Sequence, residues 1–272
     1  MKSILCPTDF SGAARSGIEY AAQLARALQA TITLTYVRPT IWPEAIQLTQ
    51  DKALSNEKLS EQLQLVCKEI RDTYGVVCNF HLQTTTDTLA ETIAAQASFH
   101  DMIVMGTNGA ENYYQHMFGS NTFHVIEQSK CPVLLVPEGC AYKIPRVIVY
   151  AYDPETNPIF LIDQLKQLVK PLDTSVHVLH ISEETPSEDS DMKIVVLKEA
   201  VRARVPSDNG WTFDSQYSDD ISWALDHYMT NHDAEILAMS FHHRTLLEKV
   251  FTQSVVKKIT MVAQYPVYVF WY

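Results

Sequence analysis

The chain contains the same order of predicted strands and helices twice, and this repeat constrains its fold more than any other feature. Apolar runs rich in β-branched residues alternate with segments of helical periodicity, and the alternation restarts near residue 146. The two halves also end alike, with CPVLLVP in the first and YPVYVFW in the second. Strands that alternate with helices form parallel sheets with helices on both faces. We therefore expect two tandem α/β domains, each with a five-stranded, mainly parallel sheet.

The ranges of the predicted elements follow from these patterns. The strands of the first half are expected at 3–7, 31–37, 76–84, 101–106 and 132–137, and its helices at 11–28, 56–74, 88–97 and 120–129. The strands of the second half are expected at 146–152, 174–182, 211–218, 234–240 and 265–272, and its helices at 158–170, 191–203, 219–230 and 253–263. The predicted domains are residues 1–138 and 145–272, joined by a linker around 138–145.

Composition excludes several classes of function. The formal net charge of −11 disfavours binding to nucleic acid or anionic membranes, since both need basic surface. No apolar run approaches the roughly 20 residues that span a bilayer, and the N-terminal segment MKSILCPTDFSG does not resemble a signal peptide. We expect no nucleic-acid partner, no membrane partner and a cytoplasmic location.

The cysteines and histidines do not indicate a metal site. The five cysteines all lie in the first half and show no C-x-x-C spacing, so we expect buried thiols, as at Cys6, rather than a disulfide framework or a zinc site. His242 and His243, with His227 and His232 upstream, lack a carboxylate or cysteine at helical ligand spacing. A polar loop is the favoured interpretation of His242 and His243, and no structural metal is expected.

A group of glycines follows the fourth predicted strand, with the spacing Gly106-x2-Gly109-x9-Gly119-Ser120. Glycine permits positive φ and a close approach of the backbone to a ligand. The helix that follows offers unpaired N–H groups and a partial positive charge at its N-terminus. A strand, a glycine-containing loop and a helix N-terminus together favour binding of a negatively charged ligand such as a nucleotide.

These residues resemble the signature of the universal stress protein family, which carries G-x2-G-x9-G-[ST] after its fourth strand. The segment Pro7-Thr8-Asp9-Phe10-Ser11 after the first strand is also similar to that family. The resemblance covers both halves, although the glycines occur only in the first. It implies two Rossmann-like domains of the adenine nucleotide alpha hydrolase type. It also implies a stress-response or regulatory protein that binds an adenine nucleotide in its first domain.

The resemblance implies a role for each matching residue. Asp9 would face the ribose or the adenine edge, and the backbone of Val37 would read the adenine edge. Gly106 and Gly109 would let the loop pass under the ribose and phosphates, and the start of the next helix would present N–H groups and hydroxyls. The implied nucleotide-binding residues are Pro7, Thr8, Asp9, Val37, Met105, Gly106, Gly109, Gly119, Ser120, Asn121 and Thr122.

From the residues alone, structural interpretations stay open beside these roles. A carboxylate at Asp9 accepts hydrogen bonds from hydroxyl donors, but it also suits a helix N-cap. The glycines and the hydroxyl residues also suit a turn followed by helix capping. Val37 would otherwise be an ordinary residue at a strand end.

One departure from the family concerns charge. Members that bind ATP often have Lys or Arg between the second and third glycines, whereas this loop, AENYYQHMF, has neither and contains Glu111. A carboxylate repels a triphosphate, and His116 would help only when protonated. ATP and AMP, with or without Mg²⁺, both stay open as the ligand. Tyr113 and Tyr114 would either stack on the ligand or cover the site.

The second half has lost the glycines. Ser240 stands in the place of Gly106 and His243 in the place of Gly109, while residues 252–253 replace Gly119-Ser120 with one residue fewer between. We expect a degenerate domain that pairs with the first as an intrachain pseudo-dimer through strands 133–136 and 267–270. Association into a homodimer stays open.

Motifs of common enzymes do not occur in the sequence. GxxxxGK[ST], a GxGxxG after the first strand, G-x-S-x-G and H-E-x-x-H are missing, so no catalytic residue is assigned. The leading hypothesis is a nucleotide-binding stress or regulatory protein whose ligand affects its choice of an unknown protein partner. The alternatives are a slow ATP hydrolase and a ligand-free scaffold.

Overall fold

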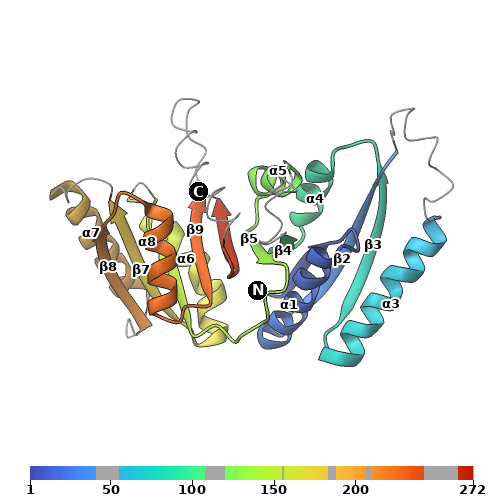
Figure 1. The fold of residues 1–272 in the computed structure, drawn as a ribbon, viewed down its shortest axis with the longest axis horizontal. Coiled ribbons are helices and arrows are strands. Elements are labelled where there is room, and N and C mark those ends of the chain that lie inside the picture. Colours follow the sequence, from blue (N-terminus) through green and yellow to red (C-terminus); the bar gives the residue numbers. More distant parts are fainter. Residues whose placement is uncertain are drawn as a thin grey trace. The chain divides into compact units, whose positions relative to one another are not determined.

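Each half of the chain forms a parallel sheet with helices on both faces, as the computed structural model shows (Figure 1). The structure describes residues 1–40, 55–107, 120–154, 156–182, 188–205, 210–241 and 263–271. The described residues divide into two compact units, and the division falls between Tyr142 and Lys143.

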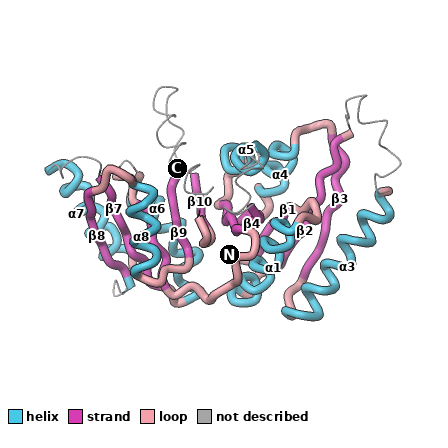
Figure 2. The backbone as a smooth tube through the Cα atoms, in the orientation of Figure 1, coloured by secondary structure: helices cyan, strands magenta, loops and turns pink. Residues whose placement is uncertain are grey.

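The first unit has strands in the order β3-β2-β1-β4-β5, and neighbouring strands are parallel. Figure 2 shows its strands in magenta and its helices in cyan. The strands are β1 (Ser3–Pro7), β2 (Thr31–Pro39), β3 (Cys78–Thr85), β4 (Met102–Thr107) and β5 (Val133–Pro137). The helices are α1 (Gly12–Leu28), α3 (Asn56–Tyr74), α4 (Leu89–Ala97) and α5 (Ser120–Gln128). The five-stranded parallel sheet expected from the sequence is confirmed, and β2 extends two residues beyond its predicted end.

The helices of the first unit cover the two faces of its sheet in pairs. Helices α1 and α3 contact each other on one face, and α4 and α5 contact each other on the opposite face (Figure 1). Helix α1 buries a stripe of small and aliphatic side chains that includes Ile18, Ala21 and Leu28, as its periodicity predicts. Helix α4 begins with a capping box between Thr88 and Glu91.

The second unit repeats this topology, with its strands in the order β10-β9-β6-β7-β8. The strands are β6 (Val147–Ala151), β7 (Ser175–Ser182), β8 (Trp211–Tyr217), β9 (Ile236–Phe241) and β10 (Val267–Trp271). The helices are α6 (Pro158–Leu172), α7 (Glu188–Arg204) and α8 (Ile221–Asn231). The helix expected at 253–263 lies almost entirely outside the described residues. The pairing of the last strands of the two units stays a prediction.

The repeat extends to individual hydrogen bonds. The carboxylate of Asp101, just before β4, accepts hydrogen bonds from the backbone N–H groups of Lys2 and Ser3 at 2.6 and 3.0 Å. Glu235, just before β9, accepts the same pair from residues 146–147 at 2.8 and 3.0 Å. In both units an acid before the fourth strand thus holds the start of the first strand beside it.

We expect Asp101→Asn to weaken the first unit in a way that depends on pH. Burial opposes ionisation of Asp101, but the hydrogen bonds from Lys2 and Ser3 outweigh it and lower the pKa of its carboxyl. A lowered folded-state pKa contributes stability above the unfolded-state pKa of about 3.9, and that stability is lost as the pH falls further. The substitution should lower the free energy of unfolding by about 1 kcal/mol at pH 7.

Urea denaturation at pH 7 and at pH 3 measures this effect. The difference between Asp101→Asn and the unchanged protein should be large at pH 7 and shrink at pH 3. The matched control is Asp72→Asn on the exposed surface of α3, which should change neither midpoint. An equal loss for Asp101→Asn at both pH values would contradict the role of the charge.

The described helices do not include a membrane span. Within the described ranges, none of the helices is both long enough and apolar enough to cross a bilayer.

Candidate functional site

The carboxyl ends of β1 and β4 lie next to each other in the middle of the first sheet. From β1 the chain enters α1 on one face, and after β4 it reaches α5 on the opposite face. This is a topological switch point, and ligands of open α/β sheets bind outside the carboxyl ends of the strands at such a point. Of the predicted site residues, those at the ends of β1 and β4 are located here by the fold of the first unit.

The turn between β1 and α1 is held by side chains that accept backbone hydrogen bonds. Thr8 Oγ1 accepts from the N–H of Phe10 at 3.1 Å, and Asp9 Oδ1 accepts from the N–H of Ser11 at 2.9 Å. Ser11 is the N-cap of α1, and its Oγ accepts from the N–H of Ala14. The N-cap interpretation of Asp9 is therefore wrong, because Ser11 is the cap and Asp9 braces the turn before it. The Asp9 carboxylate is exposed.

Phe10 adopts an uncommon backbone conformation in this turn. Its φ is +63°, in the left-handed region that residues with a Cβ seldom occupy. Its ring stacks on Tyr36 of β2, with centroids 5.4 Å apart and planes inclined by 27°. Strained residues of this kind concentrate at ligand sites, where the surrounding structure holds them in place. The neighbouring Pro7 ends β1 and pairs with Thr35.

Gly106 makes a close contact with helix α1. A Cβ atom at this position would lie 1.7 Å from the carbonyl oxygen of Ala13. The contact is reciprocal, because a Cβ at Gly17 of α1 would lie 2.5 Å from the backbone nitrogen of Gly106. Glycine at both positions lets the helix backbone lie directly against the end of β4. Sequence reasoning assigned Gly106 to the ligand alone and missed this packing role.

The residues on either side of Gly106 in β4 are buried at the same edge. Met105 is largely buried, and Thr107, which ends β4, is buried and accepts a hydrogen bond from the N–H of Glu138 at 2.7 Å. Gly106 pairs with Val136 of β5. The end of β4 is thus fixed on both sides, by α1 and by β5.

Helix α5 begins at Ser120, directly after the glycine-containing loop. Asn121 lies in its first turn, and Thr122 in the same turn is buried. The first N–H groups of a helix lack partners within the helix and carry partial positive charge. Gly109 and Gly119 lie outside the described residues, as do Glu111, Tyr113, Tyr114 and His116.

Residues near the end of β2 lie on the same side of the sheet, where the carboxyl ends of the strands meet. Val37 is half-buried and pairs with Gln83 of β3. The next residue, Arg38, was not predicted, and its Nη1 donates to Asn56 Oδ1 at 2.7 Å. Arg38 could have been predicted from the sequence, because it is a basic residue directly after Val37. It supplies positive charge near the sheet edge, whereas the glycine loop has neither Lys nor Arg.

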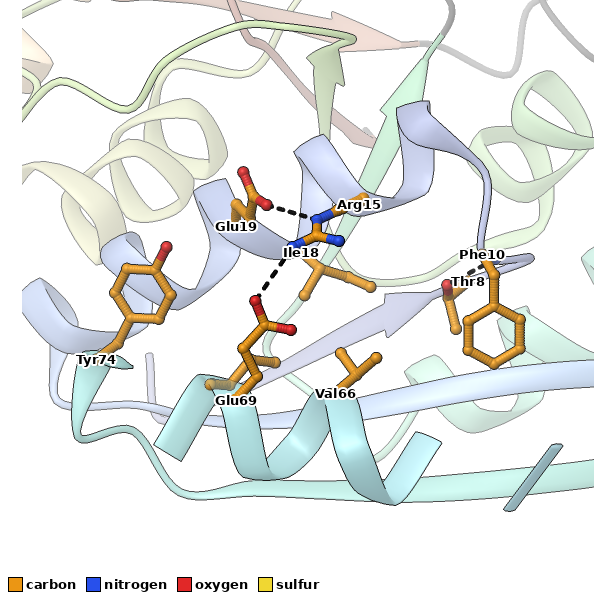
Figure 3. A pocket seen from close by; sticks show the side chains of 9 residues that line it. Thr8, Phe10, Arg15, Ile18, Glu19, Val66, Glu69 and Tyr74 are labelled. Atoms are coloured by element: carbon orange, nitrogen blue, oxygen red, sulfur yellow. Dashed lines mark hydrogen bonds and ion pairs between the residues drawn. The ribbon is translucent and has the colours of Figure 1, made fainter. Parts of the chain in front are cut away.

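A cavity of about 210 Å³ lies between helices α1 and α3 rather than outside the strand ends. Figure 3 shows Thr8 and Phe10 at one end of it and Tyr74 at the other, with Ile18 and Val66 between. Arg15 of α1 forms an exposed ion pair with Glu69 of α3 at 3.1 Å, which joins the two helices, and a second one with Glu19 of its own helix at 2.9 Å. Exposed ion pairs contribute little stability.

The equivalent place in the second unit is filled by hydroxyl side chains. Ser240 stands where Gly106 does, and its Oγ lies 2.9 Å from the hydroxyl of Tyr150 and 2.8 Å from that of Thr156. All three residues are buried. The turn from β6 to the N-cap Asn157 of α6 comprises residues 152–156, longer than the corresponding residues 8–10 of the first unit. A residue with a side chain thus occupies the place of Gly106 in this unit, and Thr156 of the turn lies within hydrogen-bond distance of it.

Two histidines of the second unit lie in α8 or at its end. His227 lies in α8, where its ring stacks on Trp223 at 5.0 Å, and His232 caps that helix and stacks on Tyr228 at 3.9 Å. His227 thus lies within the helix predicted at 219–230. His242 and His243 fall outside the described residues, and within the described part no group of three potential metal ligands occurs.

Relatives of known sequence and structure match this chain. Universal stress protein MJ0531 of Methanocaldococcus jannaschii is 28% identical over 140 residues, which are 50% of this chain and 81% of that protein. The crystal structure of a universal stress protein from Archaeoglobus fulgidus has a TM-score of 0.78 at 20% identity and covers 98% of this chain and 97% of its own. A putative universal stress protein from Pseudomonas aeruginosa has a TM-score of 0.65 at 16% identity and covers 100% of this chain and 93% of its own.

The two structural matches extend over both units, so the tandem fold is shared with these proteins. The model of the universal stress protein family matches residues 1–137, half of the 272-residue chain. The protein therefore belongs to the universal stress protein family.

Proposed function

We propose that the first unit binds one adenine nucleotide at the carboxyl ends of β1 and β4. The observation that carries the proposal is the position of the Asp9 turn and of Gly106 on adjacent strands at the switch point, with the N-terminus of α5 after the next loop. This arrangement offers a carboxylate for hydroxyl groups of a ribose and a helix N-terminus for phosphates. Membership of the universal stress protein family supports it.

Each segment has a separate task in the proposed complex. The turn of Pro7, Thr8 and Asp9 positions the carboxylate, and the backbone at Val37 contacts the adenine edge. Met105 and Gly106 line the bottom of the proposed site at the ends of β1 and β4. The phosphates lie against the loop and the start of α5, at Gly109, Gly119, Ser120, Asn121 and Thr122.

Charge governs how many phosphates the site accepts. Glu111 of the glycine loop repels a triphosphate, whereas Arg38 adds positive charge at the end of β2. We propose that the nucleotide, as ATP, ADP or AMP and with or without Mg²⁺, changes the affinity of the protein for a regulatory protein partner. The second unit lacks the glycines and contributes no second nucleotide site.

A specific observation supports a second candidate, a scaffold without ligand. The contact of Gly106 with Ala13 and Gly17 explains that glycine without any nucleotide. Under this alternative the glycines serve packing and loop geometry only.

Thermal unfolding in the presence of adenosine, AMP, ADP and ATP separates these two functions. A ligand at 100 times its Kd stabilises the native state by about 2.7 kcal/mol, which raises the Tm of a domain of this size by on the order of 8 °C. Guanosine and GTP serve as controls and should have no effect. A larger rise in Tm with AMP than with ATP would show that the negative charge of the glycine loop disfavours the triphosphate. No shift with any adenine compound at millimolar concentration would reject nucleotide binding and favour the scaffold.

A further inference from the structure

Two cysteines of the first unit lie in contact although they are eleven positions apart in the sequence. Cys67 is in the second half of α3 and Cys78 is the first residue of β3, and their Sγ atoms are 3.1 Å apart. Both side chains are buried. The chain reverses between them at Gly75, whose φ of +69° is the left-handed conformation that ends α3. The helix end and the strand start are thus held at a distance suited to a covalent bond.

The two thiols differ in their environment. The Cys78 thiol donates a hydrogen bond to Cys67 Sγ, which lowers the pKa of Cys67. Burial opposes this effect, and the nearby positive charge of Arg71 adds to it. The same hydrogen bond, together with burial, raises the pKa of Cys78. Burial raises the pKa of Cys131 to about 11. The hydrogen bond therefore makes Cys67 the more acidic of the two thiols.

The geometry is close to that of a disulfide. A disulfide has an S–S distance of about 2.05 Å, so the two sulfur atoms need to approach by roughly 1 Å. Small shifts of side chains at the end of a helix and the start of an edge strand supply such a movement. Strand β3 lies at the edge of the sheet, and Val77 just before it is 56% exposed, so local opening at this edge admits a small oxidant.

We propose that Cys67 and Cys78 form a reversible dithiol–disulfide site that responds to hydrogen peroxide. The Cys67 thiolate attacks one peroxide oxygen, the O–O bond breaks, and a sulfenic acid forms at Cys67 while the other oxygen leaves as water after taking a proton. Cys78 then attacks the sulfenic sulfur, the S–S bond forms, and the sulfenic oxygen leaves as a second water. Two thiols and one hydrogen peroxide thus give one disulfide and two waters.

The disulfide joins α3 to the sheet. Cys67 lies between residues of α3 that line the cavity beside α1, namely Val66, Glu69 and Ile70. Oxidation therefore restrains this wall of the cavity, and a dithiol reductant releases it. Such bonds in a reducing compartment are transient and sense redox conditions. Neither Cys67 nor Cys78 is among the residues of the proposed nucleotide site.

Thiol counting in the full-length protein tests the site. The reduced protein is treated with a few equivalents of hydrogen peroxide, unfolded in urea with N-ethylmaleimide, and its mass is measured. We expect five alkylated cysteines before oxidation and three after it, with digestion giving a crosslink between the peptides of Cys67 and Cys78. Oxidation should also raise the Tm by roughly 5 °C or more, because the bond restricts the unfolded chain, and a dithiol should reverse both changes.

Matched variants identify the pair. Cys67→Ser should keep all four remaining thiols alkylatable after peroxide. Cys78→Ala leaves Cys67 without its resolving thiol, so Cys67 should be oxidised to a sulfenic acid and no crosslink between Cys67 and a residue at 78 should form. Neither variant should show the rise in Tm, whereas Cys140→Ser should still form the bond. If one variant folds poorly, thiol counting and the peptide crosslink in the unchanged protein still test the proposal. Five alkylatable thiols after peroxide, a crosslink between other cysteines, or oxidation that ends as sulfinic acid at Cys67 would each overturn the proposal.

Discussion

Replacing Gly106 with alanine is expected to lower the free energy of unfolding of the first unit by about 3 kcal/mol. The added Cβ would lie 1.7 Å from the carbonyl oxygen of Ala13 and 2.3 Å from its carbonyl carbon. These are backbone atoms, so the clash cannot be relieved by a rotamer change and requires α1 to move off the sheet. Urea denaturation followed by circular dichroism measures the effect.

Two further glycine variants show whether the cause is the helix contact. Gly17→Ala should cost a similar amount, because its Cβ would lie 2.5 Å from the nitrogen of Gly106. Gly210→Ala in the second unit should have the midpoint of the unchanged protein or a slightly higher one. Its Cβ would meet Ser175 no closer than 3.6 Å, which is ordinary contact. Full stability of both Gly106→Ala and Gly17→Ala would refute the close contact.

Asp9→Ala is expected to weaken adenine-nucleotide binding by roughly 10- to 100-fold. The proposed role of the carboxylate is to accept hydrogen bonds from ribose hydroxyls or the adenine edge, and hydrogen bonds to charged groups are worth about 1.5–3 kcal/mol. Isothermal titration calorimetry with the nucleotide that gives the largest thermal shift measures the change in Kd.

The internal repeat supplies the control for this substitution. Asp153 follows the first strand of the second unit as Asp9 follows that of the first, so Asp153→Ala should leave the Kd unchanged. Asp9→Asn retains an oxygen that can accept from the N–H of Ser11, so it should preserve the turn while weakening binding. Equal Kd values for Asp9→Ala and the unchanged protein would place the nucleotide elsewhere or exclude it.

Much of the fold was predictable because it depends on local patterns. Apolar alternation located the strands, and helical periodicity located α1 and α3 to within a residue or two. The duplicated order of elements predicted that both sheets have the same topology, which the strand orders of the two units confirm. The boundaries were less accurate, as at β2, because strand ends depend on hydrogen bonds to a neighbour such as β3.

The candidate site was only partly predictable. The spacing around Gly106 indicated a ligand loop, but the contact of that glycine with Ala13 and Gly17 joins segments about ninety residues apart. The same holds for Cys67 and Cys78, which had no motif spacing yet lie in contact. Arg38 was not predicted, because the comparison of charge with the family concerned only the loop between the second and third glycines.

The sequence by itself determined the class of fold, its duplication and the location of a glycine signature in the first half. These properties follow from short-range periodicity and from residue types that favour particular backbone conformations. Only the tertiary structure decided which glycine serves a helix contact, which residue caps α1 and which hydroxyls replace the glycine in the second unit. These features depend on groups that meet across adjacent strands and helices, because in a closely packed interior each atom contacts neighbours that are distant in the sequence.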